Sequence, residues 1–148
     1  MTYQEKKTIV TLISGILIFV LYCLYMAPQY PEGGANSPET LRYWGSFVLV
    51  LTAVTIIAHI LIIIVFNIIF RMTTGEKEPN FEDELDKLIR LKSLRNSFAV
   101  FVLGFLLAMG ALTIDQPLKV MFIILVASGF LSDMTGSLSR LYHYRRGV

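Results

Sequence analysis

The most constraining feature of this sequence is the gathering of its apolar residues into four long blocks. The blocks run from Thr8 to Met26, from Phe47 to Phe70, from Phe98 to Ile114, and from Leu118 onward. A helix needs about 20 residues to cross the hydrocarbon core of a bilayer, which is about 30 Å thick. The first two blocks reach this length without any Asp, Glu, Lys or Arg. The pattern predicts an all-α fold, an integral membrane four-helix bundle.

The composition agrees with a membrane class, because 55% of the residues are hydrophobic and only 16% are charged. The third block is shorter than the first two, and the fourth is purely apolar only as far as Leu131, so we expect each to extend into its flank. The 148 residues are expected to form a single four-span domain. The expected elements are spans at about 8–27, 43–70, 97–114 and 118–140, with an inner amphipathic helix at about 80–96.

The distribution of Lys and Arg predicts the orientation of the chain, because basic residues accumulate on the cytoplasmic side of membrane proteins. Of the 13 Lys and Arg residues, only Arg42 and Lys119 lie in the connections after spans one and three. The others precede span one, lie between spans two and three, or end the chain. We therefore expect both termini and the central connection to be cytoplasmic.

The connection between spans two and three carries the pattern of an amphipathic helix. Asn80 is suited to cap its start, and acidic residues follow directly, where the positive end of a helix dipole favours them. Asn96-Ser97 is the expected bend into span three. Apolar residues recur at intervals of three and four and form a candidate partner surface. This surface consists of Phe81, Leu85, Leu88 and Ile89.

Polar residues inside the spans form a candidate intramembrane site. His59 lies near the middle of span two, and Asp133 is the only acid within span four. Counted from the outer ends at about 1.5 Å per residue, both lie roughly 22 to 24 Å below the outer surface, so they could meet. Ionisable groups at such depth mark a functional site or a structural pair inside the bundle, and both interpretations stay open. The candidate site comprises His59, Asp133, Thr55 and Ser137.

Small residues recur every four positions in span four, at Ser128, Ser132 and Gly136. Such a row lets two helix backbones approach closely, and Gly104 with Ala108 offers a weaker version in span three. The row predicts a helix-packing surface, either within the chain or between two copies of it.

The sequence has none of the motifs that indicate a conventional enzyme. It has no phosphate-binding glycine loop and no nucleophile elbow, and its two His residues and single Cys do not form a metal cluster. We therefore expect a non-enzymatic protein with no cofactor, no catalytic residue and no metal site.

Two segments carry a resemblance to a known family. They are Asp83-Glu84-Leu85-Asp86-Lys87-Leu88-Ile89, followed by Lys92 and Arg95-Asn96-Ser97, and the closing Leu141-Tyr142-x-Tyr144-Arg145-Arg146-Gly147-Val148. The chain resembles a bacterial and archaeal family of small four-span membrane proteins that carry a domain of unknown function. The resemblance implies a multi-pass protein of the bacterial cytoplasmic (inner) membrane with the same topology. The resemblance also suggests that family members often occur as neighbours of small helix-turn-helix regulators. This association hints at a role in signalling.

The sequence thus predicts an interaction or regulatory subunit that presents its inner helix to a partner. The expected partners are the lipid bilayer, a second copy of the chain, or a cytoplasmic protein such as a transcription regulator, without direct contact to nucleic acid. The alternative is a small transporter or channel subunit, assembled as an oligomer around His59 and Asp133.

Overall fold

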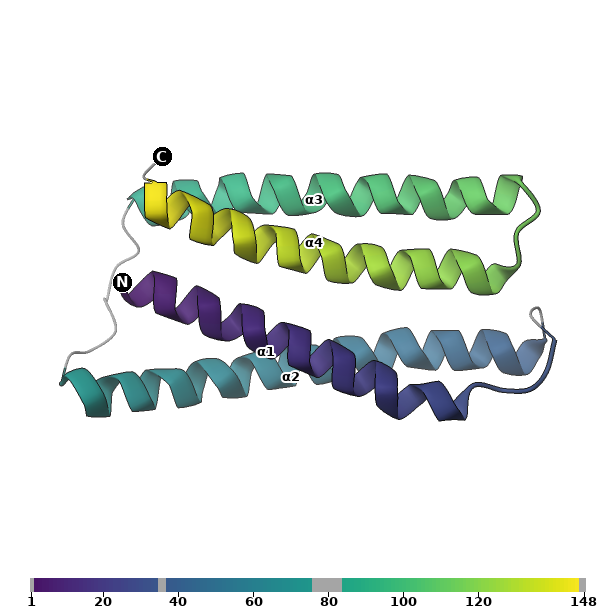
Figure 1. The fold of residues 1–148 in the computed structure, drawn as a ribbon, viewed down its shortest axis with the longest axis horizontal. Helices are drawn as coiled ribbons and strands as arrows, with labels where there is room; N and C mark the ends of the chain where they lie inside the picture. The colour runs from purple at the N-terminus through teal and green to yellow at the C-terminus, as the bar shows by residue number, and fades with distance from the viewer. Residues whose placement is uncertain (1, 35–36, 76–83, 147–148) are drawn as a thin grey trace.

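A computed structural model describes residues 2–34, 37–75 and 84–146 and contains four long helices (Figure 1). Each helix is long and apolar enough to cross a membrane. The bounds are α1 (Tyr3–Met26), α2 (Pro38–Thr74), α3 (Glu84–Thr113) and α4 (Leu118–Arg146), with a short 3-10 helix η1 (Ala27–Gln29) after α1. We call the end at which α1 and α3 begin the basic end, and the opposite end the loop end.

Local capping explains where the first two helices begin and where α2 finishes. The Thr2 hydroxyl accepts a bond from the Glu5 amide at 3.3 Å, and the Glu5 carboxylate accepts one from the Thr2 amide at 2.9 Å. This reciprocal pair is a capping box. Ser37 caps α2 and is followed by Pro38, which has no amide hydrogen to leave unsatisfied. Gly75, at φ 71°, closes α2 in a left-handed conformation that glycine adopts without strain.

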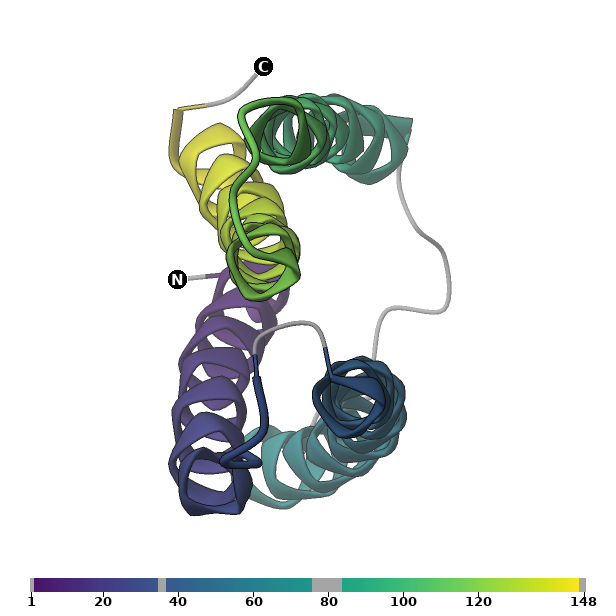
Figure 2. The same ribbon diagram turned by 90° about the vertical axis from the view of Figure 1, so that its right-hand side faces the viewer.

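The helices pack in the order α2, α1, α4, α3 rather than as a closed ring. The most extensive contact joins α3 to α4, and smaller contacts join α1 to α2 and α1 to α4. Among the described residues, α2 and α3 make no extensive contact with each other. Seen from the loop end, the four helices form an open C whose gap lies between α2 and α3 (Figure 2). The bundle is therefore not closed by an extensive contact between α2 and α3.

The α3–α4 hairpin is built from the row of small residues in α4. Ser128, Ser132 and Gly136 are all buried, and a Cβ atom added to Gly104 of α3 would run into the Ser128 side chain. The Ser132 hydroxyl donates to the carbonyl of Ser97 at 2.8 Å. Of the two alternatives that the sequence left open for this row, the structure shows packing within the chain.

At the loop end, an aromatic cluster attaches α2 to the other helices. Tyr22, Trp44 and Phe47 form the buried core of this cluster. The Trp44 ring stacks on Phe122 of α4 with centroids 5.7 Å apart and planes 2° apart. The Tyr22 hydroxyl donates to the carbonyl of Phe47 at 3.0 Å. These contacts hold α2 against α1 and α4, whereas it makes no extensive contact with α3 in the described part of the chain.

At the basic end all four helices extend beyond the predicted spans. The helix α3 differs from the prediction in a second way. It runs from Glu84 to Thr113 without a break, so no bend occurs at Asn96-Ser97. The reason is that both side chains bond to α4, the Asn96 amide to Ser139 at 3.0 Å and the Ser97 hydroxyl to Ser132 at 2.8 Å. The expected inner helix and the third span are one continuous helix over the described part, while its first residues, 80–83, lie outside the described residues.

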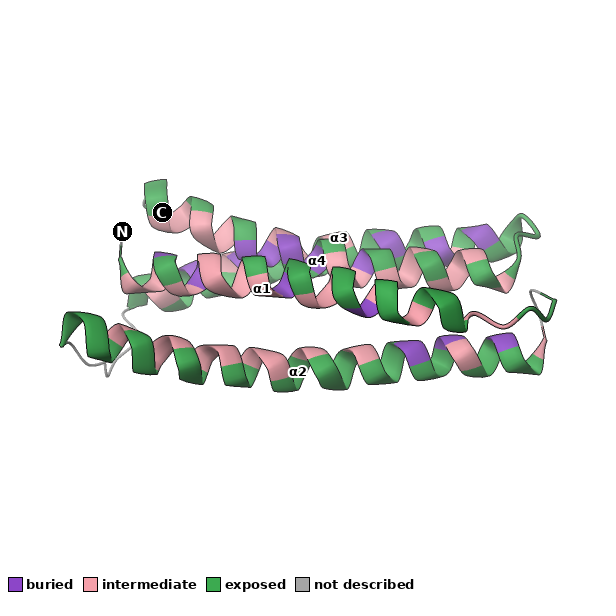
Figure 3. Ribbon diagram, turned by 60° about the horizontal axis from the view of Figure 1, so that its bottom comes forward, coloured by how far each residue is buried: buried purple, intermediate pink, exposed green. Residues whose placement is uncertain are grey.

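The outward faces of the helices are exposed, as Figure 3 shows for α2 in particular, and they carry many large apolar side chains. In water such a surface would drive aggregation, whereas in hydrocarbon it is the favoured one. Exposed apolar side chains and a core of small residues are what a helical bundle in lipid requires.

Candidate functional site

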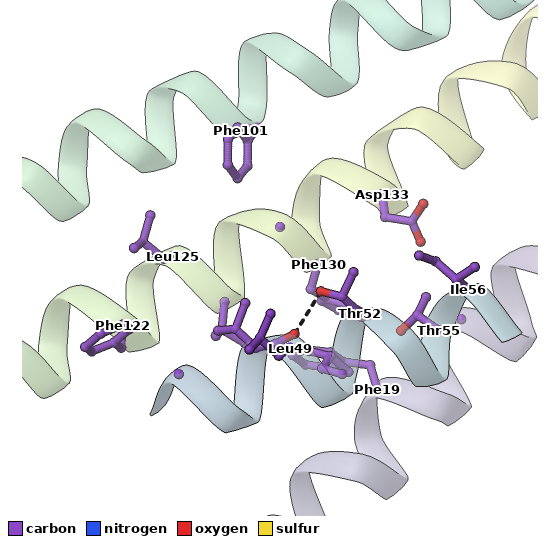
Figure 4. Close-up of a pocket in the computed structure, with 16 residues that line it drawn as sticks. Phe19, Leu49, Thr52, Thr55, Ile56, Phe101, Phe122, Leu125, Phe130 and Asp133 are labelled. Atoms are coloured by element: carbon purple, nitrogen blue, oxygen red, sulfur yellow. Dashed lines mark hydrogen bonds between the residues drawn. The ribbon is translucent and has the colours of Figure 1, made fainter. Parts of the chain in front are cut away.

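A cleft of about 690 Å³ occupies the open side of the bundle and is lined by residues of all four helices. Its wall is mainly aliphatic and aromatic. Figure 4 shows Phe101 of α3 and Asp133 of α4 directed toward α2, with Phe19 of α1 beside Phe130. The polar side chains on the wall are Thr52, Thr55 and Asp133.

Two glycines leave room in this cleft. A Cβ atom added to Gly45 of α2 or Gly129 of α4 would meet no heavy atom within 4 Å. Both residues line the cleft. The space is therefore set by the separation of α2 from α3 and by the absence of side chains at these positions.

Asp133 is the single ionisable side chain among the described residues that line the cleft. It is exposed, and within residues 2–34, 37–75 and 84–146 its carboxylate makes no hydrogen bond or ion pair. Its position on α4 follows from the helix period, because Ser132 and Gly136 face α3 while Asp133 is turned by about 100° from Ser132. A carboxylate in an apolar, membrane-depth cleft is costly unless something compensates its charge.

His59 and Asp133 converge on Gly15 of α1 but are not bonded to each other. A Cβ atom added to Gly15 would lie 3.6 Å from Oδ2 of Asp133 and 4.0 Å from Cε1 of His59. His59 is half-buried, and its Nδ1–H donates to the carbonyl of Thr55 at 3.0 Å. Three of the four predicted site residues, His59, Asp133 and Thr55, thus gather near one another. Ser137 does not join them, because it faces the interior and accepts a bond from Arg140 at 3.2 Å.

Two smaller polar cavities lie at the basic end. One of about 250 Å³ is lined by His59 and by charged residues that include Lys7, Asp86, Arg90 and Arg140. The other, of about 190 Å³, is lined by Arg90, Arg140, Asp133 and Ser93. The buried Ser93 hydroxyl and the Nε of Arg140 have no hydrogen-bond partner in the described part of the chain. These cavities can hold water or a small polar group next to the apolar cleft.

The candidate partner surface is only partly exposed. Leu85 is 46% exposed and Leu88 is 43% exposed. Ile89 is 0% exposed, because its side chain faces the interior of the helix bundle. Phe81 lies outside the described residues. Sequence reasoning over-counted this surface because an apolar stripe does not reveal which of its members faces the adjoining helix.

Sequence reasoning missed the residues that give the cleft its shape. Phe19, Phe101, Phe122 and Phe130 resemble any other apolar residue of a span, and Gly15 resembles any other small residue. The one residue that could have pointed to the cleft was Asp133. Burying its charge in a membrane is energetically costly, which indicates polar or water-accessible surroundings.

The fold and cleft define a class of all-α protein with four candidate membrane spans and a partly open cleft lined by all four helices. No family model, curated protein or solved structure matches this chain. Within the described residues, no group of three or more His, Cys, Asp or Glu side chains is placed to hold a metal ion.

Proposed function

We propose that this chain is a non-enzymatic subunit of the bacterial cytoplasmic membrane that binds a ligand between α2 and α3 and presents the beginning of α3 to a cytoplasmic partner. The observation that carries the proposal is the open side of the bundle. A single four-helix bundle normally fills its interior with side chains. Here α2 and α3 stand apart and enclose a cleft of about 690 Å³.

The cleft is suited to binding rather than to conduction. From Asp133 toward the loop end its wall is apolar apart from two threonines, Thr52 and Thr55. The Thr52 hydroxyl already donates to the carbonyl of Val48 on its own helix, at 2.8 Å. A polar solute would find few groups to replace its hydration along this path.

The alternative function, an oligomeric transporter or channel, is favoured by one observation. His59 and Asp133 converge on Gly15, and polar cavities continue from them to the basic end. This arrangement would supply half of a polar path. A second copy would have to supply the other half, because the loop-end half of the cleft is apolar.

The beginning of α3 is the surface we propose for a cytoplasmic partner. Leu85 and Leu88 are exposed there among charged neighbours. Two adjacent leucines on one helix face suit the groove or helix of another protein. A regulator of transcription is the partner class that the family resemblance suggests.

A photoreactive amino acid at Leu88 is expected to give a defined protein adduct in native membranes, because its side chain would lie in the interface. The matched control is Met72, which is 82% exposed and also lies near the basic end, on α2. The adducts are separated on gels and identified by mass spectrometry. Equal labelling from Leu88 and Met72 would reject this surface as the partner site.

The proposed orientation is tested by cysteine accessibility in intact cells, after Cys23 is replaced by Ala. Gly34→Cys is expected to react with a membrane-impermeant maleimide added outside, because Gly34 lies between α1 and α2 at the loop end. Lys87→Cys, near the start of α3, is expected to react only after permeabilisation. The reverse pattern would place the termini outside and remove the cytoplasmic partner from the proposal.

A further inference from the structure

We propose that the cleft binds a lipophilic organic cation, such as a quaternary ammonium or phosphonium compound, with the Asp133 carboxylate as its counter-ion. This inference rests on the proposed function, because it assumes that the cleft is a ligand site. It adds the chemical class of the ligand and the residue that selects it.

The charge of the cleft favours a cation. Asp133 is the single ionisable side chain on the wall in the part of the chain that the structure describes, and no Lys or Arg joins it there. Arg90 and Arg140 share the smaller neighbouring cavity with Asp133, but neither forms an ion pair with it. A cation in the cleft would supply the opposite charge that this carboxylate lacks. In a cleft of low dielectric, that attraction is much stronger than it would be in water.

The aromatic residues of the cleft favour the same ligand. The Phe19 and Phe130 rings are stacked with centroids 4.1 Å apart and planes 16° apart, and both line the cleft. Phe101 and Phe122 line it from α3 and α4 (Figure 4). Ring faces attract organic cations and also contact their apolar substituents. A carboxylate at one end of an aromatic cleft thus matches a charge carried on a bulky apolar body.

The size and the opening of the cleft also suit a lipophilic organic cation. About 690 Å³ lies within the range of small-molecule sites, which is about 300 to 1,000 Å³. The cleft is partly open rather than enclosed, and no extensive contact between α2 and α3 closes it, so a compound dissolved in the bilayer could enter from lipid. An anionic amphiphile fits the cleft less well, because Lys7, Arg90 and Arg140 line the polar cavities and not the cleft itself.

The test measures binding of tetraphenylphosphonium to the full chain in nanodiscs of phosphatidylcholine, by equilibrium dialysis against empty nanodiscs. Asp133→Asn removes the charge and nearly keeps the shape, whereas Asp133→Glu keeps the charge. Gly129→Leu fills the cleft, because Gly129 lines it and has free space around its Cβ position. Gly110→Leu is its matched control, an exposed glycine of α3 with free space that does not line the cleft.

The expected result is saturable binding that falls about tenfold or more in Asp133→Asn and in Gly129→Leu. Asp133→Glu and Gly110→Leu are expected to bind within about threefold of the original chain. Equal binding by the original chain and Asp133→Asn, with both folded by circular dichroism, would overturn the inference. So would saturable binding of phosphatidylglycerol but not of the phosphonium, although that result would keep the cleft as a ligand site. Failure of the proposed function is distinguished by the Leu88 adducts, which do not depend on the cation.

Discussion

Replacing Gly104 by Ala is expected to destabilise the α3–α4 hairpin by about 2 kcal/mol, which is within the usual range for overpacking a tight interior. The added Cβ atom would overlap the Ser128 side chain and would lie 3.4 Å from the Cα atom of Ser128. The two helices must therefore separate or the serine must shift. Because this is the most extensive helix contact in the chain, we expect a large effect on unfolding in bilayers or mixed micelles.

The control and the rescue both use residues of the same hairpin. Gly110→Ala adds the same atom to the same helix where no neighbour lies within 4 Å, so it is expected to be neutral or slightly stabilising. Adding Ser128→Gly to Gly104→Ala removes the atoms that clash and should restore most of the lost stability. Additive effects of the two substitutions would show that Gly104 and Ser128 are not in contact.

Replacing Trp44 by Ala is expected to cost about 3 kcal/mol and to loosen α2 from α4. Trp44 is buried and stacks on Phe122, and the contacts between α2 and α4 are otherwise few. The value is at the lower end for truncating a buried Trp, because lipid gives little hydrophobic driving force between helices and the loss is one of packing. Spin labels on the loop-end turns of α2 and α4 should report a longer and broader distance distribution.

The variant Trp44→Phe tests whether the stacking on Phe122 is what attaches α2. The Nε1 atom of Trp44 is buried without a hydrogen-bond partner in the described residues, so a phenyl ring loses no bond and can still stack on Phe122. We expect Trp44→Phe to keep more than half of the stability that Trp44→Ala loses. If the two variants were equally destabilised and showed the same distances, the stack would not be what attaches α2.

Much of the fold could be predicted from the sequence, for reasons that lie in single helices. Four apolar blocks of sufficient length predict four helices, and the row of Ser128, Ser132 and Gly136 predicts a close helix contact. The structure contains the four helices and places this row against α3. These features depend on length and on residue size, and both are visible along the chain.

The shape of the candidate site could not be predicted, because it depends on how the helices are placed relative to one another. The apolar sequence of α2 would be the same whether α2 packed against α3 or stood apart from it. The bend expected at Asn96-Ser97 is absent for a similar reason, since both side chains bond across to α4. His59 and Asp133 were expected at one depth, but only the fold shows that Gly15 lies between them.

The packing order of the helices makes the α1–α4 seam the main connection between two hairpins, and such a seam could act as a hinge. The chain consists of two hairpins, α1–α2 and α3–α4, and the extensive contact between them is the seam of α1 against α4. Seen down the bundle, this seam lies on the closed side of the C, opposite the gap (Figure 2). Because the Trp44–Phe122 stack attaches α2 to α4 at the loop end, rotating one hairpin about the seam would separate α2 and α3 mainly toward the basic end, as in the hinge motions of domains that close on ligands. The width of the cleft would then vary with one angle, and the charged beginning of α3 would move with it as part of the same rigid helix.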